Sequence, residues 1–152
     1  MPSYRELLAR TKQNINEVTP EEAEPKLGTA TFLDVREQDE YDAGTIPGAI
    51  HIPRGFLESQ VESKIPNRDA ELVVYCAGGV RSAFAVETLN ELGYTNAVSV
   101  SGGFGQWKNE GREWITPAVL TAEQRDRYKR YILIPEVGEA GQQKLLESKV
   151  LL

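Results

Sequence analysis

The sequence is poor in the two residue types that most often build metal sites and covalent crosslinks. Its 152 residues include one cysteine, Cys76, and one histidine, His51. A single cysteine excludes a disulfide within the chain, and one cysteine with one histidine is too few for a usual zinc site. We therefore expect no metal and no internal disulfide, so that any reaction at Cys76 is that of a lone thiol.

The chain also lacks an excess of basic residues and long apolar runs. Its 17 Lys and Arg residues against 23 Asp and Glu residues give a net charge of −6, which argues against nucleic acid or an acidic membrane surface as a partner. The N-terminal stretch MPSYRELLARTK has no apolar core of a signal peptide, and no run approaches membrane-spanning length. We expect a cytoplasmic protein whose thiol stays reduced.

The most informative stretch is residues 71–93, ELVVYCAGGVRSAFAVETLNELG. The apolar, valine-rich run from Leu72 to Tyr75 predicts a buried strand, and the apolar residues of 82–92 recur at helical spacing. A tight loop joins the two, and Ser82 is predicted to cap the helix. The loop with its closing residues consists of Cys76, Ala77, Gly78, Gly79, Val80, Arg81 and Ser82.

This loop has the composition of an anion-binding cradle with a thiol inside it. Two adjacent glycines, Gly78 and Gly79, let successive backbone N–H groups point inward, and a helix N-terminus adds about half a positive charge. Arg81 adds a fixed positive charge. Each feature favours a thiolate over a thiol, so Cys76 is the candidate nucleophile and residues 77–82 are the candidate binding residues.

Strands and helices alternate along the chain with short connections, which predicts an α/β fold with a parallel sheet of about five strands covered by helices on both faces. Asp34 and Arg36 follow a predicted strand at residues 31–35, at the sheet edge where open α/β folds place their sites. The simplest interpretation is that Asp34 ties down loops and Arg36 forms a surface ion pair. His51 is expected to pack or face solvent rather than act as a base, and Trp107 to anchor a helix or shape the pocket entrance.

The loop CAGGVRS, with four residues between Cys76 and Arg81, resembles the active-site loop of the rhodanese family of sulfurtransferases. LDVRE at 33–37, EYDAGTIPGAIHIP at 40–53 and SGGFGQW at 101–107 resemble the family's other signatures, in the family's order. One departure is Thr45, where the family often has His. The resemblance implies a rhodanese-like fold with the Cys76 strand near its centre, and it implies that Asp34 and Arg36 support the active-site edge.

The C-terminal stretch RYILIPEVGEAGQQKLLESKVLL, residues 130–152, resembles the opening of adenylating proteins related to ubiquitin-activating enzymes. That group activates small sulfur carriers for molybdopterin and thiamine synthesis. We therefore expect a rhodanese-like domain at residues 1–117, followed at 118–152 by a linker and the truncated start of an adenylating domain of a fusion protein. The alternative is an ordinary C-terminal helical extension. ATP would belong to the missing adenylating domain, and the chain itself is expected to need no cofactor.

Three functions are compatible with these residues. In the first, Cys76 takes sulfur from thiosulfate or a persulfidated cysteine desulfurase, and passes it to a nucleophilic acceptor such as a ubiquitin-like sulfur-carrier protein. In the second, the cradle serves a Cys-dependent phosphatase or arsenate reductase. Those enzymes generally keep five residues between Cys and Arg, whereas this loop has four. In the third, the domain is a non-catalytic docking module.

Overall fold

The computed structural model describes residues 2–117, and the fold lies within the unit Met1–Ile115. One five-stranded parallel sheet has the strand order β1-β5-β4-β2-β3. The strands are β1 (Asn16–Val18), β2 (Thr31–Asp34), β3 (Ile50–His51), β4 (Leu72–Tyr75) and β5 (Ala97–Val100). The helices are α1 (Tyr4–Asn14), α2 (Pro20–Ala23), η1 (Glu24–Lys26), α3 (Gln38–Ala43), η2 (Arg54–Phe56), α4 (Leu57–Lys64), α5 (Val80–Glu91) and α6 (Gly103–Asn109).

Strand β4 is the centre of the sheet, as the sequence predicted. It pairs with β2 on one side and with β5 on the other, and all four of its residues are buried. A strand that is covered on both faces has no polar side to show, which explains why Leu72 to Tyr75 reads as a continuous apolar run. The predicted α/β class, the parallel sheet and the central position of the strand before Cys76 are therefore confirmed.

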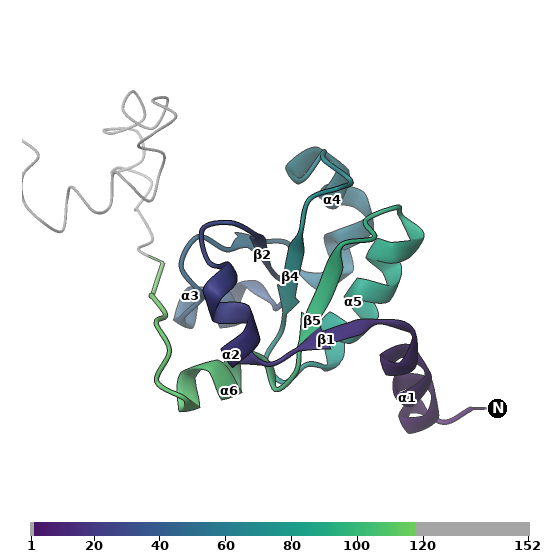
Figure 1. Ribbon diagram of the computed structural model, residues 1–152, viewed down its shortest axis with the longest axis horizontal. Helices are drawn as coiled ribbons and strands as arrows, with labels where there is room; N and C mark the ends of the chain where they lie inside the picture. The colour runs from purple at the N-terminus through teal and green to yellow at the C-terminus, as the bar shows by residue number, and fades with distance from the viewer. Residues whose placement is uncertain (1, 118–152) are drawn as a thin grey trace, which may run out of the picture. The chain divides into compact units, whose positions relative to one another are not determined.

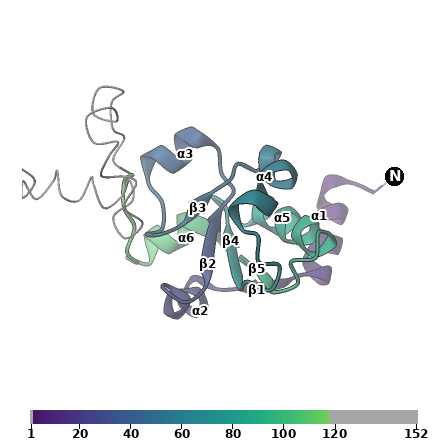
Figure 2. The same cartoon turned by 90° about the horizontal axis from the view of Figure 1, so that it is seen from above.

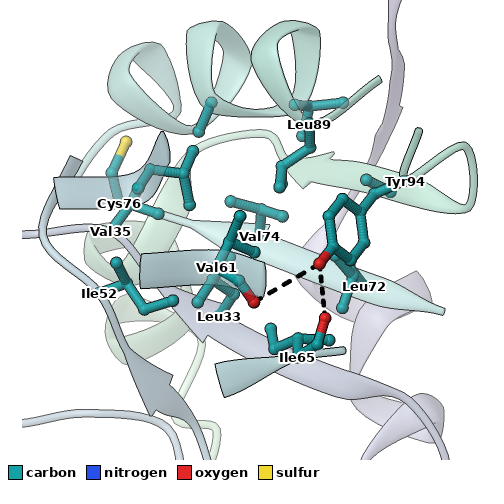
Figure 3. Close-up of a cluster of buried hydrophobic side chains, with 14 residues drawn as sticks. Leu33, Val35, Ile52, Val61, Ile65, Leu72, Val74, Cys76, Leu89 and Tyr94 are labelled. Atoms are coloured by element: carbon teal, nitrogen blue, oxygen red, sulfur yellow. Dashed lines mark hydrogen bonds between the residues drawn. The ribbon is translucent and has the colours of Figure 1, made fainter. Parts of the chain in front are cut away.

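Helices cover both faces of the sheet (Figures 1 and 2). Two apolar clusters lie on opposite faces of the sheet. The first joins β2 and β4 to α4 and α5, and its buried Tyr94 donates its hydroxyl to the carbonyl of Ile65 (Figure 3). The second joins the other face to α2 and α6 and includes Phe32, Phe104 and Trp107. Trp107 is fully buried, so its role is to anchor α6 to the core rather than to shape a pocket entrance.

The start of α5 differs from the prediction. The helix begins at Val80, and the residue before it, Gly79, has φ of +98°, a left-handed conformation that suits glycine. Ser82 is therefore already inside the first turn and is not the N-cap, because the N-cap lies at Gly79, three residues earlier than the sequence indicated. The consequence for the site is that the Ser82 hydroxyl is directed to other partners, which are described below.

The adenylating segment, the helical extension and the domain assigned to 118–152 lie outside the described residues. Within residues 2–117, no helix combines the length and the apolar character needed to cross a membrane.

A buried ion pair lies at the carboxyl edge of the sheet, where β2 ends. Arg36 donates from Nε to Asp34 Oδ1 at 3.0 Å and from Nη2 to Asp34 Oδ2 at 2.7 Å, and the two side chains are 5% and 0% exposed. Arg36 also donates to the carbonyl of Gly44 and lies over the ring of Phe104, 4.3 Å from its centroid. The prediction that Arg36 forms a surface pair is therefore wrong, because the strand ends and α6 enclose it.

Two hydroxyl groups extend this network to the end of the central strand. Thr45 Oγ1 donates to Asp34 Oδ2 at 3.0 Å, so the 2.6 Å contact with Tyr75 is made by the tyrosine hydroxyl donating to Thr45. The N–H of Ile46 then donates to the Tyr75 oxygen. Burial, followed by the charge of Asp34, raises the pKa of Tyr75, which keeps its hydroxyl protonated as this chain of donors requires. Thr45 thus makes buried structural contacts with both Asp34 and Tyr75.

Removing Arg36 tests how much this network stabilises the sheet edge. Arg36→Ala leaves the Asp34 carboxylate buried without its charged partner, and we expect a loss of about 3–5 kcal/mol in the free energy of unfolding. Lys26→Ala is the matched control, because the Lys26–Glu71 pair is partly exposed and its loss should cost less than about 1 kcal/mol. Urea unfolding measures both. Equal, small losses would show that the buried pair does not hold the edge.

Candidate active site

Cys76 lies at the carboxyl end of the central strand, immediately after β4. Its residue exposure is 1%, and its side chain belongs to the cluster that includes Val35 and Val86 (Figure 3). The next two residues, Ala77 and Gly78, are exposed, so the loop that carries the thiol reaches the surface. This position, at the end of β4 and before the N-terminus of α5, is one where parallel sheets place binding and catalytic groups.

The sulfur of Cys76 accepts hydrogen bonds from backbone N–H groups of its own loop. Gly79 N lies 3.1 Å and Ser82 N lies 3.3 Å from Sγ. The first N–H groups of a helix have no acceptor within the helix, and here the sulfur takes the place of that acceptor for Ser82. Together with the helix dipole, these donors favour negative charge on sulfur.

Helix α6 keeps the loop in this shape. Phe104 N donates to the carbonyl of Cys76 at 2.8 Å, and Gly105 N donates to the carbonyl of Ala77 at 3.0 Å. These two hydrogen bonds attach the first two carbonyls of the loop to α6. Gly103 permits the approach, since its φ is +59° and a Cβ there would lie 2.4 Å from the Cys76 carbonyl oxygen. The SGGFGQW motif is therefore the outer support of the cradle.

Arg81, which the sequence analysis identified as a positive charge of the cradle, is paired with an acidic residue of α3. Its guanidinium makes a two-pronged ion pair with Glu40 of α3, with Nη1–Oε2 at 2.7 Å and Nη2–Oε1 at 2.9 Å. The two side chains are about one-third exposed. The hydrogen bond from Arg81 lowers the pKa of Glu40 to about 2, and the same bond raises the pKa of Arg81.

The direction of the Glu40 shift sets the pH range of this pair. A carboxyl whose pKa is depressed in the folded state stabilises that state above its ordinary value of 4.5, and the contribution is lost as the pH falls towards about 2. Near neutral pH the pair is therefore intact. Arg81 contributes a cation at the rim of the cradle whose charge is compensated by Glu40.

Ser82 provides a third polar group next to the sulfur. Its Oγ lies 3.5 Å from Cys76 Sγ and 2.8 Å from the Oγ of Ser99, on the neighbouring strand β5. Both serines are fully buried. The cysteine is thus in contact with a short row of hydroxyls as well as with backbone N–H groups.

The structure brings together all the residues predicted from the loop, while Asp34 and Arg36 occupy a separate network. Among residues 2–117, no hydrogen bond or ion pair joins Asp34 or Arg36 to Cys76. They brace the strand ends on which the loop depends. His51 stacks on Tyr41, and its Nε2 contacts the carbonyl of Arg36 at 2.7 Å, which fits the packing role expected for it.

Two residues of this site were not predicted from the sequence. Glu40 lies in α3, and its position 41 residues before Arg81 gives no local sign of the pair. Ser99 lies in an apolar strand, where it is fully buried, and a polar residue inside such a run is the signal that could have singled it out.

Comparison with known proteins agrees with this geometry. The family model described as a rhodanese-like domain matches residues 19–110. A human thiosulfate:glutathione sulfurtransferase is 36% identical over 92 residues, which cover 53% of this chain and 80% of that protein. The solved structure of a rhodanese-related protein from Thermoplasma volcanium has a TM-score of 0.61 and 38% identity, covering 66% of this chain and 98% of that one.

Some relatives are longer than the matched region. A putative sulfur carrier protein, YrkF, from Bacillus subtilis is 36% identical over 76 residues, which make up 50% of this chain but only 40% of that protein. On the match over residues 19–110 and the fold around Cys76, the chain belongs to the rhodanese-like domain family.

Proposed function

We propose that this protein is a sulfurtransferase that carries sulfane sulfur as a persulfide on Cys76. The observation that carries the proposal is the sulfur of Cys76 accepting two backbone N–H bonds at the N-terminus of α5. Membership of the rhodanese-like family and relatives named as sulfurtransferases support the same reaction class.

The reaction would take place in two displacements. In the first, the Cys76 thiolate attacks the outer sulfur of thiosulfate, a new S–S bond forms, and sulfite leaves with the electron pair of the broken S–S bond. In the second, a nucleophilic acceptor attacks the outer sulfur of the persulfide, and the Cys76 thiolate leaves. The first step consumes a thiolate and the second regenerates it, so transfer to a nucleophilic acceptor such as cyanide needs no oxidant or reductant.

The cradle would act on the charges that appear in these steps. Gly79 N and Ser82 N are already within hydrogen-bond distance of the sulfur that is the nucleophile in the first step and the leaving group in the second. Because donors that are fixed before the reaction need not reorganise, they stabilise the thiolate form more effectively than water. The remaining free N–H groups of the first turn of α5 are suited to the charge on the outer sulfur.

The donor and the acceptor are proposed from the reaction class and from the C-terminal sequence. Thiosulfate or a persulfidated cysteine desulfurase would serve as donor, and the cytoplasm as the compartment. A ubiquitin-like sulfur carrier for molybdopterin or thiamine synthesis is the proposed acceptor, because residues 130–152 resemble the opening of proteins that adenylate such carriers. Fusion would raise the effective concentration of the persulfide at the adenylated carrier to roughly millimolar.

The two alternatives differ from this proposal in measurable ways. A phosphatase or arsenate reductase must surround a tetrahedral oxyanion, for which the four residues between Cys76 and Arg81 make a small ring. A docking module would need neither the thiol nor the donors directed at it. Both alternatives predict that no stable sulfur adduct forms on the chain.

The first prediction concerns Cys76 as the sulfur carrier. Incubation with thiosulfate should raise the intact mass by that of one sulfur atom, and cyanide should remove that mass and release thiocyanate. Cys76→Ser should abolish both changes. If the wild-type mass stays unchanged with thiosulfate and with a persulfide donor, sulfur transfer is the wrong assignment.

The second prediction compares thiosulfate with aryl phosphates as substrates and tests the Arg81–Glu40 pair at the rim of the cradle. Arg81→Ala leaves the Glu40 carboxylate unpaired beside the cradle, so the KM for thiosulfate should rise roughly tenfold with little change in melting temperature. The double variant Arg81→Ala with Glu40→Gln removes that negative charge and should recover part of the loss. Arg68→Ala, at an exposed position elsewhere, is the control. Aryl phosphate hydrolysis faster than sulfur transfer would support a phosphatase instead.

A third prediction addresses the acceptor. In the presence of a thiol reductant, the outer sulfur of the Cys76 persulfide should attack the adenylated C-terminus of a ubiquitin-like sulfur carrier and displace AMP, and the reductant should then cleave the acyl disulfide to release the Cys76 thiol and a thiocarboxylate. Mass spectrometry would show the thiocarboxylate as the replacement of one oxygen by sulfur. Cys76→Ser is the control for sulfur that comes from solution. Transfer to cyanide without any transfer to the carrier would contradict the proposed acceptor while leaving the reaction class intact.

A further inference from the structure

Two serine hydroxyls form a row beside Cys76. The donor-to-acceptor direction of the hydrogen bonds in this row depends on the charge of the sulfur. Cys76 Sγ, Ser82 Oγ and Ser99 Oγ follow one another at 3.5 Å and 2.8 Å, and all three residues are buried. Among residues 2–117, Ser99 Oγ has no other hydrogen-bond partner. The row therefore ends at Ser99.

Counting hydrogens shows which form of the cysteine completes the row. With a thiolate, Ser99 donates to Ser82 Oγ and Ser82 donates to Sγ, so both hydroxyl hydrogens have acceptors. With a thiol that donates to Ser82 Oγ, the Ser82–Ser99 contact can use only one of the two serine hydrogens, and the other is left without an acceptor in the part of the chain that the structure describes. Because an unsatisfied buried hydroxyl is unfavourable, the row favours the thiolate.

Ser99 also limits what the Ser82 side chain can do. Ser82 is the third residue of α5, and a helical serine readily turns its hydroxyl to a backbone carbonyl of the preceding turn. The 2.8 Å contact with Ser99 holds Ser82 Oγ towards the sulfur. A hydrogen bond donated by Ser99 to Ser82 also polarises the Ser82 hydroxyl, which strengthens its own donation to Sγ.

We infer that Ser99 is a positioning residue for the nucleophile, acting through Ser82. Ser99 fixes the Ser82 hydroxyl as a third donor to the Cys76 thiolate, beside the N–H groups of Gly79 and Ser82. The inference rests on the proposed role of Cys76 as a nucleophile. Ser99 would then stabilise the Cys76 thiolate in two steps of the reaction: before the thiolate attacks the sulfur donor, and when it leaves as the acceptor takes the outer sulfur of the persulfide.

The charged groups near the thiol do not change in the variants that test this inference. Arg81, from α5, and Glu40, from α3, form the ion pair at the rim, and Arg81 is close enough for its charge to interact with that of Cys76. The apolar cluster that contains Cys76 includes Val35 and Ile52, directly after β2 and β3, and Val86 of α5. A change in the reactivity of the thiol in these variants would therefore come from the hydroxyl row.

The test uses the rate of alkylation by iodoacetamide as a function of pH, which reports the thiolate of the only cysteine. Ser99→Ala should slow alkylation near neutral pH by about threefold to tenfold and move the profile to higher pH, because one donor loses its orientation. Ser82→Ala should do the same, and the double variant should lose no more than Ser82→Ala alone. Ser99→Thr keeps the hydroxyl and should restore the wild-type profile.

Ser63→Ala is the control, since Ser63 lies at an exposed position of α4 and its hydroxyl donates to the carbonyl of Gln60, away from the cysteine loop. A Ser99→Ala profile identical to wild type would overturn the inference, as would losses that multiply in the double variant. Alkylation requires no sulfur donor. The result is therefore separate from the persulfide measurement, and wild-type protein that accepts no sulfur from any donor would instead contradict the proposed function.

Discussion

The hydrogen bonds from Gly79 N and Ser82 N to the sulfur of Cys76 are the constraint on which the rest of the site depends. They exist only while the loop turns from the central strand into α5 within four residues. Gly79 makes that turn with a left-handed φ, and α6 holds the loop carbonyls away from the sulfur. Strand, turn and supporting helix together place donors around one atom, and a nucleophilic thiolate needs such an arrangement.

A second network steadies the edge of the sheet without touching the thiol. Asp34 and Arg36 join the end of β2 to the segment around Gly44 and Thr45, and Tyr75 joins that segment to the end of β4, one residue before Cys76. All of these side chains are buried, so their contacts are little screened by solvent. The motifs that lie far from the cysteine in sequence therefore act on it through the ends of the strands.

The α/β class, the strand before Cys76 and the turn that follows it could be predicted from local patterns, whereas the central position of that strand followed from the resemblance to the rhodanese family. A valine-rich run predicts β4, and adjacent glycines before an apolar helix predict the turn. The pairs that act over long separations, Arg81 with Glu40 and Ser82 with Ser99, leave no such pattern. The prediction that Ser82 caps α5 is wrong for the same reason. A serine near the start of a helix has the same sequence pattern whether its hydroxyl contacts a backbone N–H or a cysteine sulfur.

The central claim is that backbone N–H groups of the loop hold the charge of the Cys76 sulfur. Proton and nitrogen chemical shifts of the backbone amides, recorded by NMR for the thiolate and persulfide forms of one sample, test this claim most directly. The account predicts that the Gly79 and Ser82 amides show the largest changes, and that the Gly93 amide, beyond the far end of α5, does not move. Unchanged Gly79 and Ser82 signals would contradict it.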